Sequence, residues 1–250
     1  MLISHRKKFI YTKTVKTAGT SVESYFEKYC MPEGQWKPSH SRAVYETESG
    51  VIGKRGPDQT AKWIKKFKAK PKWKSHMPAV KIKNLVDEKL WNSYFKFCVI
   101  RNPYDKMVSM FYMKLQEEKE YSQYKKFKIG LKKKFNIGDP FDLSTGDDDT
   151  ERFKDWVKKG GKIIDRNMYI IQDDVCVDFF IRYEELESGI KEVCKKIAVP
   201  FEPDRIPRFK SGRRKTNTEL ADFYDEQAKD IITKKYQFEI DTFGYALNVQ

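Results

Sequence analysis

The chain has 250 residues, of which 39% are hydrophobic and 14% aromatic, and its formal net charge is +14. A sequence of this length and composition can bury a sizeable core, which excludes a disordered tail and predicts a globular protein. The positive charge favours anionic partners such as nucleic acid, acidic glycans or a nucleotide, without distinguishing between them.

The first predicted elements are a strand, a loop and a helix. Residues 9–11 are apolar and predict a short buried strand, and a polar loop over 12–19 leads into a helix that starts near Thr20. Thr20 and Glu23 have the spacing of a capping box, which predicts the helix start. The apolar stripe of this helix consists of Val22, Tyr25, Phe26 and Tyr29.

The middle of the chain contains the clearest strand. Residues 31–74 are basic and irregular and are interpreted as an insertion, and a helix is expected over about 78–90. The continuous apolar run 95–100 predicts a central strand that ends at Arg101. Pro103 then opens a helix. Its apolar side is predicted to consist of Met107, Val108, Phe111 and Leu115.

The remaining sequence alternates helices with one further strand. A second insertion is expected over 125–150, and a strand over 177–181. Helices are predicted over 153–157, 168–171, 186–197 and 219–235. Strands that alternate with helices predict one α/β domain over 1–250, with a central parallel sheet flanked by helices on both faces. Ligands of such sheets bind beyond the carboxyl ends of the strands.

The cysteine and histidine content indicates which cellular compartment and which metal sites to expect. Four cysteines without CxxC spacing and three histidines give no convincing zinc set, so no metal site is expected. Cys98 and Cys194 lie in apolar patterns and are expected to be reduced core residues, which favours a cytosolic compartment. We expect a soluble chain, because we find neither room for a signal peptide nor an apolar run of membrane-spanning length.

The loop before the first helix has the features of an anion-binding site. It consists of Lys16, Thr17, Ala18, Gly19, Thr20 and Ser21. A helix start offers unpaired N–H groups and the positive end of the helix dipole, Gly19 permits close approach, and Lys16 supplies a mobile charge. The Walker A spacing is absent, which disfavours a kinase or nucleoside triphosphatase. The alternative is an ordinary polar turn into a capped helix.

A second constellation lies at the end of the central strand. Arg101 is at the tip of the strand over 95–100, and Ser109 is on the helix that follows. A guanidinium group suits a terminal phosphate, and the serine hydroxyl can donate to the same group. The alternative is that Arg101 only pairs with a carboxylate.

Together the two constellations resemble the 5′-phosphosulfate loop and the 3′-phosphate motif of sulfotransferases that use 3′-phosphoadenosine 5′-phosphosulfate (PAPS), particularly the carbohydrate branch. The resemblance rests on KTAGTS over 16–21 and FCVIRNPYDKMVSMFY over 97–112. It continues in SHMP over 75–78, FIRYEEL over 180–186 and DTFGY over 241–245. KSGRRKT over 210–216 resembles the basic nucleotide-covering loop of heparan sulfate 2-O-sulfotransferases.

The resemblance implies a P-loop-nucleotide-kinase-like sulfotransferase fold and a PAPS-dependent O-sulfotransferase that forms adenosine 3′,5′-bisphosphate (PAP) and a sulfate ester without a metal. It assigns the proton-accepting base to His76 and the stabilisation of the leaving oxygen to Lys16. The 3′-phosphate ligands that it implies are Arg101, Ser109 and one or more of Arg213, Arg214 and Lys215. The sequence departs from the family where many members have His-x-Pro-Lys, because this chain has Lys13-Thr14-Val15-Lys16.

The acceptor and several alternatives stay open. A carbohydrate hydroxyl is expected, and the lysine-rich runs over 62–74 and 125–134 favour an anionic glycan, although they could equally be solvated faces. A lipid or tyrosyl hydroxyl is also compatible with the sequence. The chain could instead be a non-enzymatic nucleic-acid or polyanion-binding module, or a fold that binds PAPS without turnover. The paired motifs argue against nucleic acid as a partner, and a Golgi location would apply only to a trimmed chain.

Overall fold

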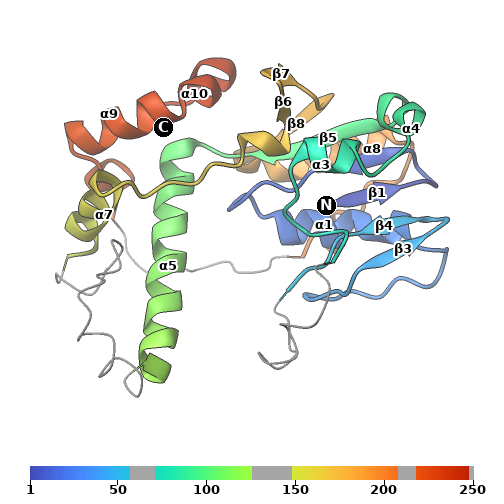
Figure 1. Ribbon diagram of the computed structural model, residues 1–250, viewed down its shortest axis with the longest axis horizontal. Coiled ribbons are helices and arrows are strands. Elements are labelled where there is room, and N and C mark those ends of the chain that lie inside the picture. Colours follow the sequence, from blue (N-terminus) through green and yellow to red (C-terminus); the bar gives the residue numbers. More distant parts are fainter. Residues whose placement is uncertain (57–70, 126–147, 208–217, 248–250) are drawn as a thin grey trace. The chain divides into compact units, whose positions relative to one another are not determined.

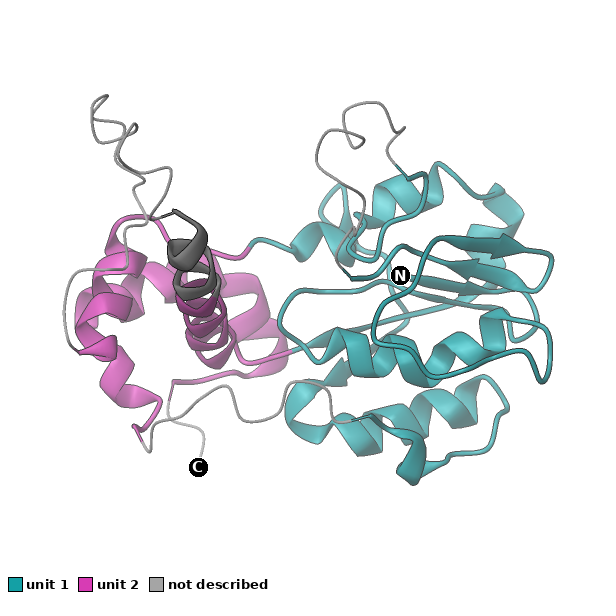
Figure 2. Cartoon of the chain, turned by 90° about the horizontal axis from the view of Figure 1, so that it is seen from below, with its two compact units in different colours: residues 1–100, 164–209 teal, residues 101–163, 210–250 magenta. Residues whose placement is uncertain are grey.

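The structure is a computed structural model that describes residues 1–56, 71–125, 148–207 and 218–247 (Figure 1). The chain divides into two compact units (Figure 2). One unit comprises residues 1–100 and 164–209 and contains the sheet, and the other comprises residues 101–163 and 210–250 and is helical where it is described.

The first unit is built on a six-stranded mixed sheet in the order β3-β4-β1-β2-β5-β8. Its strands are β1 (Leu2–Ser4), β2 (Phe9–Tyr11), β3 (Tyr45–Thr47), β4 (Gly50–Ile52), β5 (Phe95–Ile100) and β8 (Phe179–Arg182). The strands β2, β5 and β8 are parallel neighbours, whereas β1, β3 and β4 extend the sheet by antiparallel pairing. The predicted α/β class and the parallel centre of the sheet are therefore confirmed.

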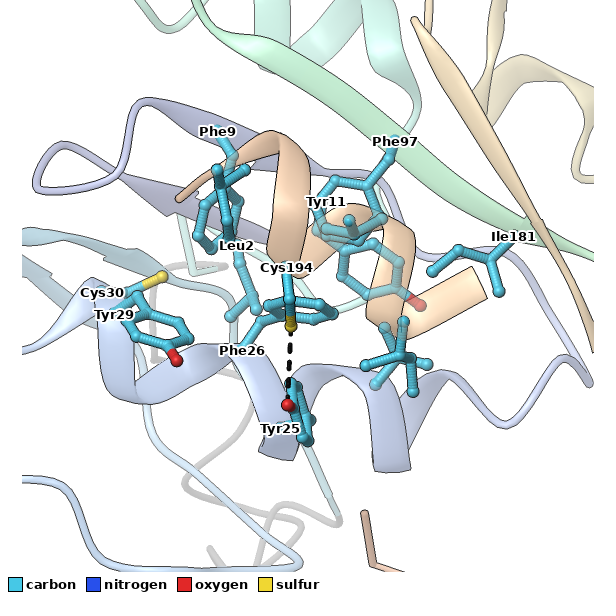
Figure 3. Packing of buried hydrophobic residues seen from close by; sticks show 14 of the residues in the cluster. Leu2, Phe9, Tyr11, Tyr25, Phe26, Tyr29, Cys30, Phe97, Ile181 and Cys194 are labelled. Carbon is cyan, nitrogen blue, oxygen red and sulfur yellow. Dashed lines mark hydrogen bonds between the residues drawn. The ribbon is translucent and has the colours of Figure 1, made fainter. Parts of the chain in front are cut away.

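Helices cover both faces of this sheet. Because successive side chains of a strand point to opposite faces, Phe9 and Tyr11 pack with α1 (Gly19–Phe26) and α8 (Leu186–Lys196), while Ile10 packs on the other side. That other side is covered by α3 (Ala79–Lys83) and α4 (Glu88–Ser93). Figure 3 shows the core between the sheet and the helices α1 and α8, in which the ring centroids of Tyr11 and Phe97 are 5.1 Å apart. The predicted core positions of Cys98 and Cys194 are confirmed, since both are buried.

Three predictions for this unit are wrong. Residues 45–52 form β3 and β4 and not an irregular segment, because β4 is buried against β1. The helix predicted over 78–90 is two helices, because the backbone of Asp87 is extended and its carboxylate caps α4 by accepting from the N–H groups of Lys89 and Leu90. The helix predicted over 168–171 is a 3₁₀ turn over Arg166–Met168 that is followed by the hairpin of β6 (Ile170–Ile171) and β7 (Asp174–Val175).

The second unit contains α5 (Pro103–Lys125), α7 (Asp149–Lys158), α9 (Glu226–Lys235) and α10 (Gln237–Phe243). The predicted apolar side of α5 is confirmed, since Met107, Val108, Phe111 and Leu115 are all buried. The last helix begins later than predicted, because the carboxylate of Asp225 accepts from the N–H of Ala228 and caps α9. No helix of the four described ranges is both long and apolar enough to cross a membrane.

The domain boundaries remain predictions. The expected single domain over 1–250 and the status of 31–74 and 125–150 as insertions are not decided by the elements above. Residues 57–70 and 126–147, which make up much of both segments, lie outside the described residues.

Candidate active site

The loop between β2 and α1 lies at the carboxyl ends of the parallel strands, where ligands of such sheets bind. Two of its residues form hydrogen bonds with the neighbouring strand β5. The backbone N–H of Thr12 donates to the carbonyl oxygen of Phe97 at 3.0 Å, and the hydroxyl of Thr14 donates to the carbonyl oxygen of Val99. The hydroxyls of Thr14 and Thr17 are also hydrogen-bonded to each other, at 2.8 Å. The loop is therefore held in one place by the strand next to it.

The same loop has an unusual backbone conformation. Lys16 and Ala18 have φ angles of 61° and 54°, in the left-handed region, which costs a residue with a side chain roughly 1–2 kcal/mol. The loop is fixed from another direction by Asp165, whose buried carboxylate accepts from the N–H of Val15 at 2.6 Å. Strained residues that are held by several contacts are typical of functional loops, because the surrounding structure sustains the strain.

The first helix begins at Gly19, and its start is not capped by a side chain. The N–H groups of Ser21 and Val22 donate to the carbonyl oxygen of Ala18, whereas the earlier N–H groups have no acceptor within the helix. These groups and the helix dipole suit a phosphate-like anion. The predicted capping box is wrong, because the Glu23 carboxylate is buried beneath the loop and pairs with Lys13 and other groups instead of capping the helix.

His76 is brought next to this loop. Its Nδ1 is 3.1 Å from the backbone carbonyl oxygen of Lys13. A carbonyl oxygen can only accept a hydrogen bond, so Nδ1 carries the proton and Nε2 of a neutral ring holds the lone pair. The residue keeps exposed surface, so a substrate can reach it.

The electrostatic surroundings of His76 keep the ring neutral. Partial burial of the ring lowers its pKa most, and Lys13 and the amino group of Met1 lower it further, to about 4. The pKa therefore lies below the ordinary value of 6.5 for a histidine. At neutral pH the ring is a base that is almost always ready to accept a proton, although a weak one.

Arg101 and Ser109 both belong to the second unit. Arg101 directly follows β5, and its Nε and Nη2 donate to the carboxylate of Asp105 at 2.8 and 2.6 Å. Ser109 is four residues beyond Asp105, so these two residues lie on the same side of α5. The alternative role for Arg101, pairing with a carboxylate, is thus present in the structure, and its contact with a 3′-phosphate stays a prediction.

The predicted residues fall into three groups. Residues 16–21 and His76 belong to the first unit, Arg101 and Ser109 belong to the second, and their meeting around one nucleotide stays a prediction. Arg213, Arg214 and Lys215 lie outside the described residues. The sequence did not reveal what Asp165, Glu23 and Ser75 contribute, because their contacts with the loop form only in the folded chain. Asp165 belongs to no motif, Ser75 was noted only as part of SHMP, and Glu23 was predicted to cap the helix.

A cavity of about 440 Å³ is present at the opposite edge of the sheet, near the turn between β1 and β2. Two of its basic side chains have acidic partners, since Arg6 pairs with Glu33 and Lys28 pairs with Glu202. It lies at the amino end of β2, away from the loop over 12–18, and we do not assign the transfer chemistry to it.

Comparisons with known proteins identify the family of the chain but do not locate its site. The chain matches the family described as "Sulfotransferase family" over residues 1–246. It is 34% identical over 133 residues to an uncharacterized protein of Archaeoglobus fulgidus, a match that covers 51% of this chain and 88% of that protein. No solved structure matches the chain.

Proposed function

Because the chain belongs to the sulfotransferase family, we propose that it transfers a sulfuryl group from PAPS to a hydroxyl of a carbohydrate, giving PAP and a sulfate ester. The observation that carries the proposal is the loop over 12–18, which leads from the carboxyl end of β2 into the uncapped start of α1 beside His76. A loop of this kind suits the phosphosulfate end of the nucleotide.

The first unit would supply the groups that act on the transferred sulfur. The S–O bond to the nucleotide phosphate breaks while a bond forms between sulfur and the acceptor oxygen. Lys16 and the N–H groups at the start of α1 would stabilise the negative charge that develops on the departing phosphate oxygen. His76 would take the acceptor proton on Nε2, a contribution worth about 10²- to 10⁴-fold in rate. Positioning and charge stabilisation supply the rest, because such transfers need little covalent work from the protein.

The second unit would supply the ligands of the 3′-phosphate. The guanidinium group of Arg101 is oriented by Asp105, and Ser109 lies on the same side of α5 as Asp105. A planar guanidinium and a nearby hydroxyl suit the three oxygens of a terminal phosphate. Arg213, Arg214 and Lys215 are further candidates on the resemblance of their segment to a nucleotide-covering loop.

The carbohydrate acceptor is supported by the resemblance of the motifs to the carbohydrate branch and by the net charge of +14, which favours an anionic glycan. A lipid or tyrosyl hydroxyl would use the same chemistry. A polyanion-binding module without turnover is the alternative of a different class, and it predicts binding that weakens steeply with salt and ignores PAPS.

One experiment separates these functions. Purified protein is incubated with radiolabelled PAPS and a panel of neutral glycans, anionic glycans, lipids and tyrosine peptides, and PAP binding is measured by calorimetry. We expect saturable PAP binding and label transfer to a glycan. Transfer to a lipid or peptide alone would correct the acceptor, and the absence of PAP binding would refute the proposed function.

A further inference from the structure

A buried group of charges lies directly beneath the candidate site. The carboxylate of Glu23, which is fully buried on α1, accepts from Lys13 Nζ at 2.6 Å and from Ser75 Oγ at 2.9 Å. Arg55 Nη1 donates to the same carboxylate at 3.3 Å, and the amino group of Met1 lies 2.5 Å from it. Lys13 also donates to Ser75 Oγ at 3.0 Å. Glu23 therefore joins four separate segments of the chain.

Two of these segments supply the acceptor and the donor of the hydrogen bond that orients His76. The acceptor of that bond is the backbone carbonyl of Lys13, and the donor ring belongs to the residue that follows Ser75. Fixing the side chains of Lys13 and Ser75 to one carboxylate therefore restricts the positions of both the acceptor and the donor.

We propose that Glu23 is a positioning residue for His76, which it orients through Lys13 and Ser75 so that Nε2 faces the acceptor hydroxyl. The proposal rests on the proposed function, because it concerns the base of that reaction. Glu23 itself does not contact the reacting atoms and is not a catalytic residue.

The packing of Gly19 connects this group of charges with the loop over 12–18. A β-carbon added at Gly19 would lie 2.8 Å from both Cγ and Cε of Lys13, closer than such atoms approach in proteins. The alkyl chain of Lys13 therefore crosses the start of α1, and its ammonium group continues to Thr20 Oγ1 at 3.4 Å and to Glu23. The small residue at the helix start provides the space that Lys13 needs to reach Glu23.

The charges of this group also act on the basicity of His76. Burial alone would raise the pKa of Glu23, but the amino group of Met1, Lys13 and Arg55 lower it to about 2, so the carboxylate is ionised at neutral pH. The groups that act on His76 are Lys13 and the Met1 amino group, which lower its pKa, and Glu23, which raises it. Removing the charge of Glu23 would therefore make His76 a still weaker base.

The test compares Glu23→Gln and Ser75→Ala with the control Glu27→Gln. In the described part of the chain, the Glu27 carboxylate is equally buried and accepts from Trp36, Arg42 and Arg55 rather than from Lys13 or Ser75. We expect kcat to fall about tenfold or more in the two test variants, with PAP affinity changed less than about twofold, because only the base is misplaced. Glu27→Gln should keep both values, and an equal loss of kcat in this control would overturn the proposal.

A second readout does not require turnover. Nitrogen chemical shifts of ¹⁵N-histidine-labelled protein at pH 7 report which ring nitrogen of His76 carries the proton. We expect the wild type and Glu27→Gln to hold the proton on Nδ1, and Ser75→Ala, which removes a single hydroxyl, to show a mixture of both forms. The pure Nδ1 form in Ser75→Ala and in Glu23→Gln would overturn the positioning role. Absence of PAP binding by the wild type would instead refute the proposed function.

Discussion

Replacing His76 by alanine should remove most of the turnover while leaving nucleotide binding intact. The structure gives His76 a hydrogen bond to a loop carbonyl through Nδ1, which leaves Nε2 to accept a proton. Loss of a general base lowers a rate by about 10²- to 10⁴-fold, which corresponds to about 3–5 kcal/mol of transition-state stabilisation. We therefore expect kcat of His76→Ala to fall within that range and the dissociation constant of PAP to stay within about twofold of the wild type, because alanine removes no nucleotide ligand in the proposed arrangement.

The pH dependence of kcat and kcat/KM in the wild type tests the same assignment of His76. The pKa of His76 is lowered to about 4, so only about one ring in a thousand is protonated at pH 7. As pH falls, kcat/KM should stay level through pH 6 and decline only as the free enzyme approaches pH 4. The acidic limb of kcat should lie at higher pH than that of kcat/KM, because the negative charges of a bound nucleotide favour the imidazolium form.

The assay measures initial rates with radiolabelled PAPS between pH 4 and 9, together with calorimetric titration of PAP. His40→Ala is the control, because it removes an exposed histidine outside the candidate site. Full turnover by His76→Ala would refute the base assignment. An acidic limb of kcat/KM near pH 6.5 that disappears in His40→Ala would show that a different histidine acts as the base.

Substitutions at three further residues test the rest of the site. Lys16→Met should lower kcat about 10²- to 10³-fold with a smaller loss of PAP affinity, measured by initial rates and calorimetry, and an equal loss in both would show that Lys16 only binds the nucleotide. Arg101→Ala should weaken PAP binding by about 10- to 150-fold, the equivalent of one charged hydrogen bond, while the affinity for adenosine 5′-monophosphate, which lacks the 3′-phosphate, stays the same. Asp165→Ala should lower the free energy of unfolding in urea by about 1–3 kcal/mol, because the N–H of Val15 loses its acceptor, and Asp165→Asn, which keeps an acceptor oxygen, should lose less. Equal losses in the two Asp165 variants would contradict this reasoning.

The elements that carry the candidate site were predicted from the sequence because their signals are local. The apolar run 95–100 and the stripe that begins at Met107 predicted β5 and α5, and the loop over 12–19 was predicted between a strand and a helix. The strands β1, β3 and β4 were missed, because three residues are too few to show a period and their pairing depends on partners elsewhere in the sheet.

The site residues likewise divide into those with a local sequence signal and those without one. The loop and His76 could be predicted from motifs, whereas the tie between Val15 and Asp165 joins residues 150 positions apart and has no local signature. Glu23 shows how a local pattern can mislead. It has the correct spacing from Thr20 for a capping box, but the buried donor groups of Met1, Lys13 and Arg55 offer its carboxylate stronger partners than the backbone N–H of a helix end.

The contacts of these buried charges also indicate what the charges contribute to the protein. Removing ions such as Lys13, Glu23 and Arg55 from water costs several kcal/mol each, and their mutual attraction only offsets that cost when the geometry is good. Apolar side chains of similar volume would stabilise the unit at least as well, so stability alone does not account for the group. Its contacts lead to the carbonyl that accepts from His76 and to the residue that precedes His76, and they cross the glycine at the start of α1. The positioning role that we propose for Glu23 would therefore account for the cost of burying these charges.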